Sequence, residues 1–341
     1  MTSRERIIAA LELKEPDVIP VAPIVRAPVA KYYGYKASEI MLDAQKFADT
    51  QLRGLEEFEY DAVWGVPVDE VAEALGCELT ILEDDSPVFT SHVVDSRADF
   101  SGLKPPNMQN SRWLDFKLSV IRHLKERVGD DAAVIAPVNP PFMSAGRLQS
   151  TTDFYLNIIA DPDLVKDLIA FCMEPGIEAA RLLTEAGADV LWAPIPTGSA
   201  NMISRRQYEE FCSPYQREFF RRLHGFGARI ITHTCGKWAD RFDLALNELP
   251  DMLHVAEADL AALKNLAKGR VGIMGQVKPV ATMMRGTPED VERECYDNMQ
   301  QAGRGGGFIL SADCGLPRDV HKENLVAMVK AAKNFPIIHG K

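Results

Sequence analysis

The chain alternates between helix-like and strand-like segments along most of its length. Each apolar run of strand length follows a stretch in which apolar residues recur every three to four positions, a spacing typical of a helix. The runs are almost continuously apolar, as expected of parallel strands that are covered on both faces. Eight such runs can be counted, at residues 18–24, 60–64, 132–137, 189–193, 228–232, 252–255, 271–274 and 307–311. Eight parallel strands with helices between them predict an α/β fold of the (β/α)8 or TIM-barrel type.

One barrel accounts for the whole length of the chain. The 341 residues fit a single (β/α)8 domain, and no linker rich in Ser, Gly or Pro divides them, so we expect one domain over 1–341. Residues 79–82 and 88–94 flank a polar turn and predict a β-hairpin inserted after the second strand. A doubly wound open sheet is the alternative, but no Gly-x-Gly-x-x-Gly follows the first strand.

Composition argues against several classes of partner. The 38 Lys and Arg residues face 49 Asp and Glu residues, a formal charge of −11, so we expect no binding of nucleic acid. No apolar run approaches the roughly 20 residues that span a bilayer, and no signal-like segment follows the N-terminus. We therefore expect a cytoplasmic protein without a membrane partner. The six dispersed cysteines are expected to be free thiols, and most of them small buried apolar residues.

Metal-type side chains follow two of the predicted strands. His233 and Cys235 end the run 228–232, and side-chain alternation in an extended segment places them on one side. Cys314 follows the run 307–311 in the same way. Because the C-terminal ends of all barrel strands face one mouth, these residues can meet there. Glu257, after the sixth strand, is a candidate fourth ligand.

This ligand set favours zinc. One imidazole, two thiolates and a carboxylate suit Zn²⁺, whereas hard ions such as Mg²⁺ prefer oxygen ligands. Ligands scattered over strand ends at the mouth favour a catalytic zinc, although a structural zinc or a metal-free His-x-Cys stays open. Two thiolate ligands donate electron density to zinc and so reduce its ability to lower the pKa of a bound water molecule. Such a zinc ion suits a substrate thiol instead, which would displace Glu257 and attack an alkyl group.

Other residues near strand ends are candidates for the same mouth. Gln276 and Asn139 follow the seventh and third strands, where their amides could bind a substrate or satisfy loop backbone. Met202 and Trp192, near the end of the fourth strand, could line an apolar pocket for a substrate or cofactor, or pack in the core. His254 has the opposite parity to Glu257 and is expected to pack or to face a loop.

Several segments carry a resemblance to a known superfamily. They are residues 4–11, 17–21, 187–190, 203–214, His233-Thr234-Cys235-Gly236, 274–277 and 309–317. The chain resembles the uroporphyrinogen decarboxylase superfamily, and within it the methylcobamide:coenzyme M methyltransferase-like branch, over nearly its whole length. The resemblance implies a (β/α)8 barrel with zinc held by His233, Cys235 and Cys314, and an acidic fourth ligand that corresponds to Glu257.

The resemblance also implies a function. It implies a zinc-dependent methyltransferase of one-carbon metabolism that moves a methyl group between a corrinoid (methylcobamide), carried by a separate corrinoid protein, and a thiol or another small compound. It does not set the direction of transfer, and coenzyme M, tetrahydrofolate, homocysteine and small methyl donors all stay open.

Two alternatives accompany this prediction. The first is a metal-free decarboxylase-like lyase acting on a tetrapyrrole or another carboxylate. The decarboxylases carry an arginine-rich motif after the first strand, where this chain has only Arg26. Asp69 lies near the position of their essential aspartate, although an Asp before a helix is often an N-cap. The second alternative is an accessory protein that binds a corrinoid or tetrapyrrole without turnover.

Overall fold

A curled sheet of parallel strands forms the centre of the molecule. The computed structural model describes residues 1–337, and its main sheet has seven strands in the order β1-β4-β5-β6-β7-β8-β9, all paired in parallel. The strands are β1 (Ala62–Trp64), β4 (Ala133–Pro137), β5 (Val190–Pro194), β6 (Ile230–Thr234), β7 (Met252–Val255), β8 (Gly272–Val277) and β9 (Phe308–Ala312). The predicted α/β fold of the TIM-barrel type is confirmed.

The first predicted strand, residues 18–24, joins the two edges of the sheet but is not a regular strand. Val21 forms a single parallel bridge with Leu310 of β9, and its carbonyl accepts a hydrogen bond of 2.7 Å from the backbone N–H of Asp61, next to β1. Pro20 and Pro23 lack backbone N–H groups, so a continuous ladder cannot form here. The expectation of eight regular strands was therefore wrong by one.

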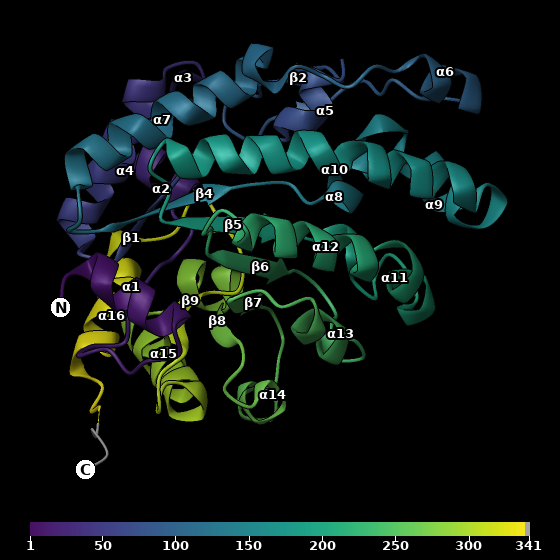
Figure 1. Cartoon of the computed structure of the whole chain (residues 1–341). Coiled ribbons are helices and arrows are strands. Elements are labelled where there is room, and N and C mark those ends of the chain that lie inside the picture. Colours follow the sequence, from purple (N-terminus) through teal and green to yellow (C-terminus); the bar gives the residue numbers. More distant parts are fainter. Residues whose placement is uncertain (338–341) are drawn as a thin grey trace.

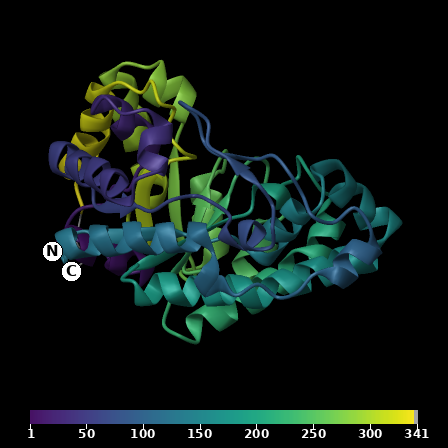
Figure 2. The same cartoon turned by 90° about the horizontal axis from the view of Figure 1, so that it is seen from above.

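Helices surround the sheet (Figure 1), and within residues 1–337 none is long and apolar enough to cross a membrane. They are α1 (Ser3–Leu11), α2 (Arg26–Tyr32), α3 (Ala37–Met41), α4 (Ala44–Phe58), α5 (Glu70–Ala74), α6 (Arg97–Gly102), α7 (Arg112–Val128), α8 (Pro141–Leu148), α9 (Thr151–Ala160), α10 (Pro162–Glu185), α11 (Arg205–Phe211), α12 (Ser213–His224), α13 (Phe242–Asn247), α14 (Leu260–Ala267), α15 (Pro288–Ala302) and α16 (Lys322–Asn334). Figures 1 and 2 show both chain ends on one side of the molecule and α6, α9 and α11 on the opposite side.

Two buried clusters account for the apolar strands. One lies inside the barrel and joins alternate strand residues, such as Ala62 and Trp64, to Ile7, Ala10 and Leu11 of α1. The other lies between the sheet and the outer helices and contains the residues of opposite parity, such as Val63. Both faces of each strand are thus covered, and α1 closes the interior at the N-terminal ends of the strands.

Local capping divides two stretches, residues 38–58 and 205–224, that the apolar periodicity predicts as single helices. The Asp43 side chain accepts a hydrogen bond of 3.0 Å from the N–H of Lys46 and starts α4 anew after α3. Pro214, in the first turn of α12, separates that helix from α11. The predicted hairpin is confirmed, although its paired arms β2 (Leu79–Thr80) and β3 (Val88–Phe89) are short.

Candidate metal centre

His233, Cys235 and Cys314 meet at the C-terminal mouth of the barrel. His233 is in β6, Cys235 follows this strand directly, and Cys314 lies two residues after β9. One ligand atom from each residue lies within 4.8 Å of the others, and in the described part of the chain this is the cluster of such residues that could hold a metal ion. The other four cysteines are buried, as expected, while these two are partly accessible.

Side-chain hydrogen bonds fix β6 against its neighbours. The Thr232 hydroxyl donates to the carbonyl of Ala193 in β5 at 3.0 Å, and the Thr234 hydroxyl donates to the carbonyl of His254 in β7 at 3.1 Å. His233 lies between these two threonines, so alternation along the strand turns its imidazole to the other side. The strand register therefore determines where the imidazole points.

The imidazole of His233 is oriented by ring contacts. It is 2% exposed, and neither of its nitrogens has a hydrogen-bond partner within residues 1–337. The Trp192 ring stacks on it with centroids 5.2 Å apart, and the centroid of His254 lies 4.4 Å away. A buried imidazole that makes no hydrogen bond keeps its nitrogen lone pair free for a metal ion.

His254 connects three strands of the barrel interior. Its Nδ1 accepts a hydrogen bond of 3.3 Å from the Trp192 indole, and its Nε2 donates to the Ala312 carbonyl at 2.7 Å. Burial lowers the pKa of His254 well below its usual value, so the ring stays neutral. His254 thus packs beside His233 and holds the end of β9, two residues before Cys314. The sequence pattern predicted that His254 packs or faces a loop, but it did not predict the hydrogen bond to Ala312.

The two thiols interact with each other. A hydrogen bond from Cys235, reinforced by the neighbouring His233, lowers the pKa of the Cys314 thiol to about 4. The same contact raises the pKa of Cys235, because that thiol keeps the shared proton. Burial and the adjacent Cys314 raise the pKa of Asp313 to about 7. One thiolate at this position is in the form that binds a soft or borderline metal ion.

These residues fit a zinc ion. A free imidazole nitrogen and two sulfur atoms match the donors that zinc prefers, and three protein ligands leave one position open. Glu257 lies outside this cluster: its side chain is exposed and its backbone has a φ of +51°. It is close enough to help raise the pKa of Asp313, so it lies at the rim of the site. Its role as fourth ligand stays a prediction.

A cavity of about 190 Å³ is separated from the cluster by Trp192, which lines the cavity and stacks on the His233 ring. Arg26 and Arg147 both line it, and within residues 1–337 neither forms an ion pair. The Arg26 guanidinium lies 5.8 Å from the Trp192 ring centroid, one of its terminal nitrogens is buried without a partner, and burial lowers its pKa to about 10. The other lining residues are Pro67, Val68, Asp69, Leu79, Pro87, Phe89, Pro137, Asn139, Met143, Trp192 and Pro194.

Asp69 and Asn139 lie in the cavity wall, and both side chains are hydrogen-bonded to neighbouring groups of the protein. The Asp69 carboxylate caps α5 through the N–H of Ala72 at 3.1 Å and accepts from the Ser144 hydroxyl at 3.0 Å. Burial raises its pKa to about 6. The Asn139 amide donates to the Val68 carbonyl at 3.1 Å. Both side chains support the loop before α5, and the catalytic role of Asp69 and the binding role of Asn139 stay predictions.

Gln276 and Met202 are the two other residues predicted to face the mouth. The Gln276 amide forms two hydrogen bonds with the backbone of Ala258, of 2.7 and 2.5 Å, so it supports the loop that follows Glu257. Met202 is 45% exposed in the loop between β5 and α11 and is not among the residues that line the cavity.

Sequence reasoning missed two kinds of residue. Arg147 lies in α8, and no strand-end rule draws attention to it. Trp238 and Arg241 fall in a stretch, residues 237–246, that the pattern predicts to be helical, whereas α13 begins only at Phe242. Both side chains are buried and hold the loop that carries Cys235.

The fold and the site place this protein in the class of (β/α)8-type barrels with a His-Cys-Cys cluster at the mouth. Residues 2–335 match the family described as Uroporphyrinogen decarboxylase (URO-D), so the chain belongs to this family of enzymes.

Relatives within the family include both activities. The Methylcobamide:CoM methyltransferase MtbA of Methanosarcina mazei is 27% identical, with 98% of each chain covered. A uroporphyrinogen decarboxylase of Synechococcus sp. is 24% identical, over 76% of this chain and 74% of its own. A solved structure described as a methyltransferase from Methanosarcina mazei has a TM-score of 0.90 at 23% identity, with 98% of both chains covered, and shows the same fold.

Proposed function

We propose that this protein is a zinc-dependent methyltransferase that moves a methyl group between a corrinoid on a partner protein and a small thiol. The observation that carries the proposal is the convergence of His233, Cys235 and Cys314, whose ligand atoms lie within 4.8 Å of one another. Similarity over 98% of the chain to a relative named as a methylcobamide:CoM methyltransferase supports it.

Different residues would bind the zinc ion, orient its ligands and shield the acceptor from water. His233, Cys235 and Cys314 would hold the zinc ion, with Glu257 as the proposed fourth ligand. When bound, a zinc ion with two thiolate ligands would lower the pKa of a substrate thiol and leave its sulfur nucleophilic. Trp192 and His254 keep the His233 imidazole in place. The apolar side chains of the cavity wall exclude water from the acceptor.

This cavity favours a small acceptor with an anionic group. Its volume of about 190 Å³ is below the roughly 300 Å³ at which pockets for drug-sized ligands begin. Arg26 and Arg147 contribute two positive charges without an ion-pairing partner among the described residues. A carboxylate or sulfonate would supply the missing counter-charge. A mercapto acid therefore fits better than a neutral thiol or a large pterin.

A decarboxylase-like lyase is the second candidate, because the same cavity contains an acid that can hold a proton near neutral pH. Asp69 has a pKa of about 6 and lies near Arg147. A carboxylate substrate held by the arginines could receive a proton from such a group. This reading makes no use of the thiol cluster.

Metal content and turnover separate the two candidates. We expect one zinc per chain in the purified protein, and methyl transfer from methylcobalamin to a mercapto acid but not to mercaptoethanol. Cys235→Ala and Cys314→Ala should each lose zinc and lower this activity about a thousandfold, because the several kcal/mol that a bound metal supplies are lost.

The matched control is Cys295→Ala, which removes a buried thiol from α15 and should keep both zinc and activity. A folded wild-type protein that is fully active after zinc removal would refute the proposal. Release of carbon dioxide from a porphyrinogen without metal would establish the lyase instead. Tight corrinoid binding without turnover would indicate the accessory role.

A further inference from the structure

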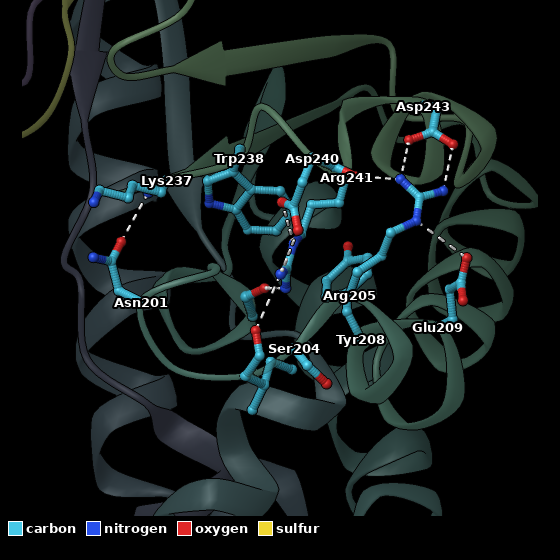
Figure 3. A network of polar contacts seen from close by, with 12 residues as sticks. Asn201, Ser204, Arg205, Tyr208, Glu209, Lys237, Trp238, Asp240, Arg241 and Asp243 are labelled. Carbon is cyan, nitrogen blue, oxygen red and sulfur yellow. Dashed lines mark hydrogen bonds and ion pairs between the residues drawn. The ribbon is translucent and has the colours of Figure 1, made fainter.

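The loop that begins with Cys235 is fastened to the loop that follows β5. The N–H of Ala200 donates to the Lys237 carbonyl at 2.9 Å, and the N–H of Lys237 donates to the Asn201 side chain at 2.9 Å. Figure 3 shows Asn201 and Lys237 facing each other across this contact. Residues 195–204 of this loop include no metal-type ligand, so the loop acts on the cluster through its backbone contact from Ile195 to His233 and through its hold on residues 235–241.

Arg241 is the charged centre of this contact. Its side chain is 1% exposed, and its two terminal nitrogens donate to the carbonyls of Gly198 and Ile203 at 2.8 and 3.0 Å. Its guanidinium lies 5.5 Å from the Tyr208 ring centroid. The neighbouring Asp240 carboxylate pairs with the guanidinium at 2.9 Å and offsets the cost of burying its charge. The two terminal nitrogens then bind both ends of the loop 198–203.

Trp238 connects this contact to the metal ligand itself. Its indole N–H donates to the Cys235 carbonyl at 2.9 Å, and its ring meets Tyr208 edge to face, with centroids 5.3 Å apart. The indole is therefore fixed on one side by Tyr208 and fixes Cys235 on the other. Figure 3 shows Trp238 next to Arg241 within the same network.

The two loops fit closely where they cross. Gly236 has a φ of +84°, and a Cβ added to it would lie 2.7 Å from the Asn201 side-chain oxygen. A Cβ added to Gly198 would lie 2.8 Å from the Tyr208 ring. Side chains larger than hydrogen are thus excluded at both positions, which leaves the residue after Cys235 little freedom to move.

We propose that Trp238 and Arg241 are positioning residues of the metal centre, which hold Cys235 in its ligand position before the metal binds. The inference rests on the proposed zinc site and adds to it that the site is preformed. Groups that orient metal ligands from outside the coordination sphere typically contribute 10- to 100-fold to metal affinity.

Trp238→Phe is the sharpest test, because it keeps an aromatic ring against Tyr208 and removes the N–H that binds the Cys235 carbonyl. We expect it to weaken zinc binding about tenfold in competition with a chromophoric chelator, and to speed zinc loss to excess chelator. The matched control is Trp113→Phe in α7, whose ring lies in the core against Phe116 and which should leave zinc binding unchanged.

A second variant keeps the test decisive if Trp238→Phe does not fold. Asn201→Ala removes the acceptor for the Lys237 N–H from an exposed position and should weaken zinc binding in the same direction by a smaller factor. Spectra of the Co²⁺-substituted proteins report whether both thiolates still bind the metal. Folded variants that bind zinc as tightly as the wild type would overturn the positioning role alone. A wild-type protein that binds no zinc would overturn the proposed function as well.

Discussion

The buried Asp189 carboxylate at one end of the barrel and the basic side chains of His233 and Arg26 at the other differ in how fully they are hydrogen-bonded. At the N-terminal ends of the strands, the Asp189 carboxylate accepts hydrogen bonds from the side chains of Arg4 at 2.7 Å and Lys125 at 3.2 Å, and from the backbone N–H of Val134 at 3.0 Å. At the C-terminal mouth, His233 and one terminal nitrogen of Arg26 have no hydrogen-bond partner within residues 1–337. Saturated groups stabilise a fold, whereas unpaired ones are available to a ligand. Asp189 therefore serves stability, whereas His233 and Arg26 are available to bind a ligand at the mouth.

The largest expected effects are a loss of stability without loss of zinc binding for a variant at the N-terminal end, and the reverse for a variant at the mouth. Asp189→Ala removes the buried carboxylate that Arg4 and Lys125 share, leaves them only the exposed Asp130, and should lower the free energy of unfolding by about 3 kcal/mol. Zinc binding by the folded protein should not change. His233→Phe removes the imidazole nitrogens but keeps a ring of similar size against Trp192 and His254, so it should change stability by about 1 kcal/mol and abolish tight zinc binding.

Urea unfolding of the metal-free proteins and chelator competition measure the two quantities separately. Asp189→Asn is the control, because its amide can still accept from Val134 and so should lose less stability than the alanine variant. If Asp189→Ala weakened zinc binding as much as His233→Phe, the division between the two ends would not hold.

Much of this division could be predicted from sequence. Apolar runs separated by helical periodicity gave the barrel, and strand parity placed His233, Cys235 and Cys314 together although 79 positions separate the two thiols. Such rules work because a parallel barrel sends every strand end to one mouth, whatever the distance along the chain. The irregular pairing of residues 18–24 follows from Pro20 and Pro23, which the apolar pattern alone does not weigh.

The remainder depended on tertiary contacts that leave no periodic signal. Asp69 was equally compatible with catalysis and with a helix cap, and only the positions of Ala72 and Ser144 show that the cap is formed. Arg241 lies in a stretch whose composition suits a helix. Its burial becomes visible only when the loop after β5 is folded against it.

The pH dependence of stability should also differ between the two ends. Hydrogen bonds from Arg6 lower the pKa of Asp17, so its contribution is lost as the pH falls. Burial raises the pKa of Asp69 from 3.8 to about 6, so the folded protein holds a proton that the unfolded chain releases near pH 4. The free energy of unfolding therefore falls as the pH rises from about 4 to 6, by at most about 3 kcal/mol.

Asp69→Asn isolates this term, because an amide oxygen can still cap α5. Urea unfolding at intervals between pH 4 and 7 should show that the wild type loses stability relative to the variant as the pH rises. Asp17→Asn is the comparison at the other end, and its difference from the wild type should have the opposite slope at low pH. Parallel curves for wild type and Asp69→Asn would show that the carboxyl is already ionised at pH 4.

The smallest expected effect concerns Gln276, whose amide holds the backbone of Ala258 next to Glu257. Gln276→Ala should cost about 1 to 2 kcal/mol of stability through two lost hydrogen bonds. If Glu257 is the fourth zinc ligand, the variant should also weaken zinc binding a few-fold, as should Glu257→Gln. The two effects should then be smaller together than their sum, because both act on one ligand, and a double-mutant cycle of zinc affinities measures the difference. Additive effects, or an unchanged affinity in Glu257→Gln, would place Gln276 with the saturated groups that only stabilise the fold.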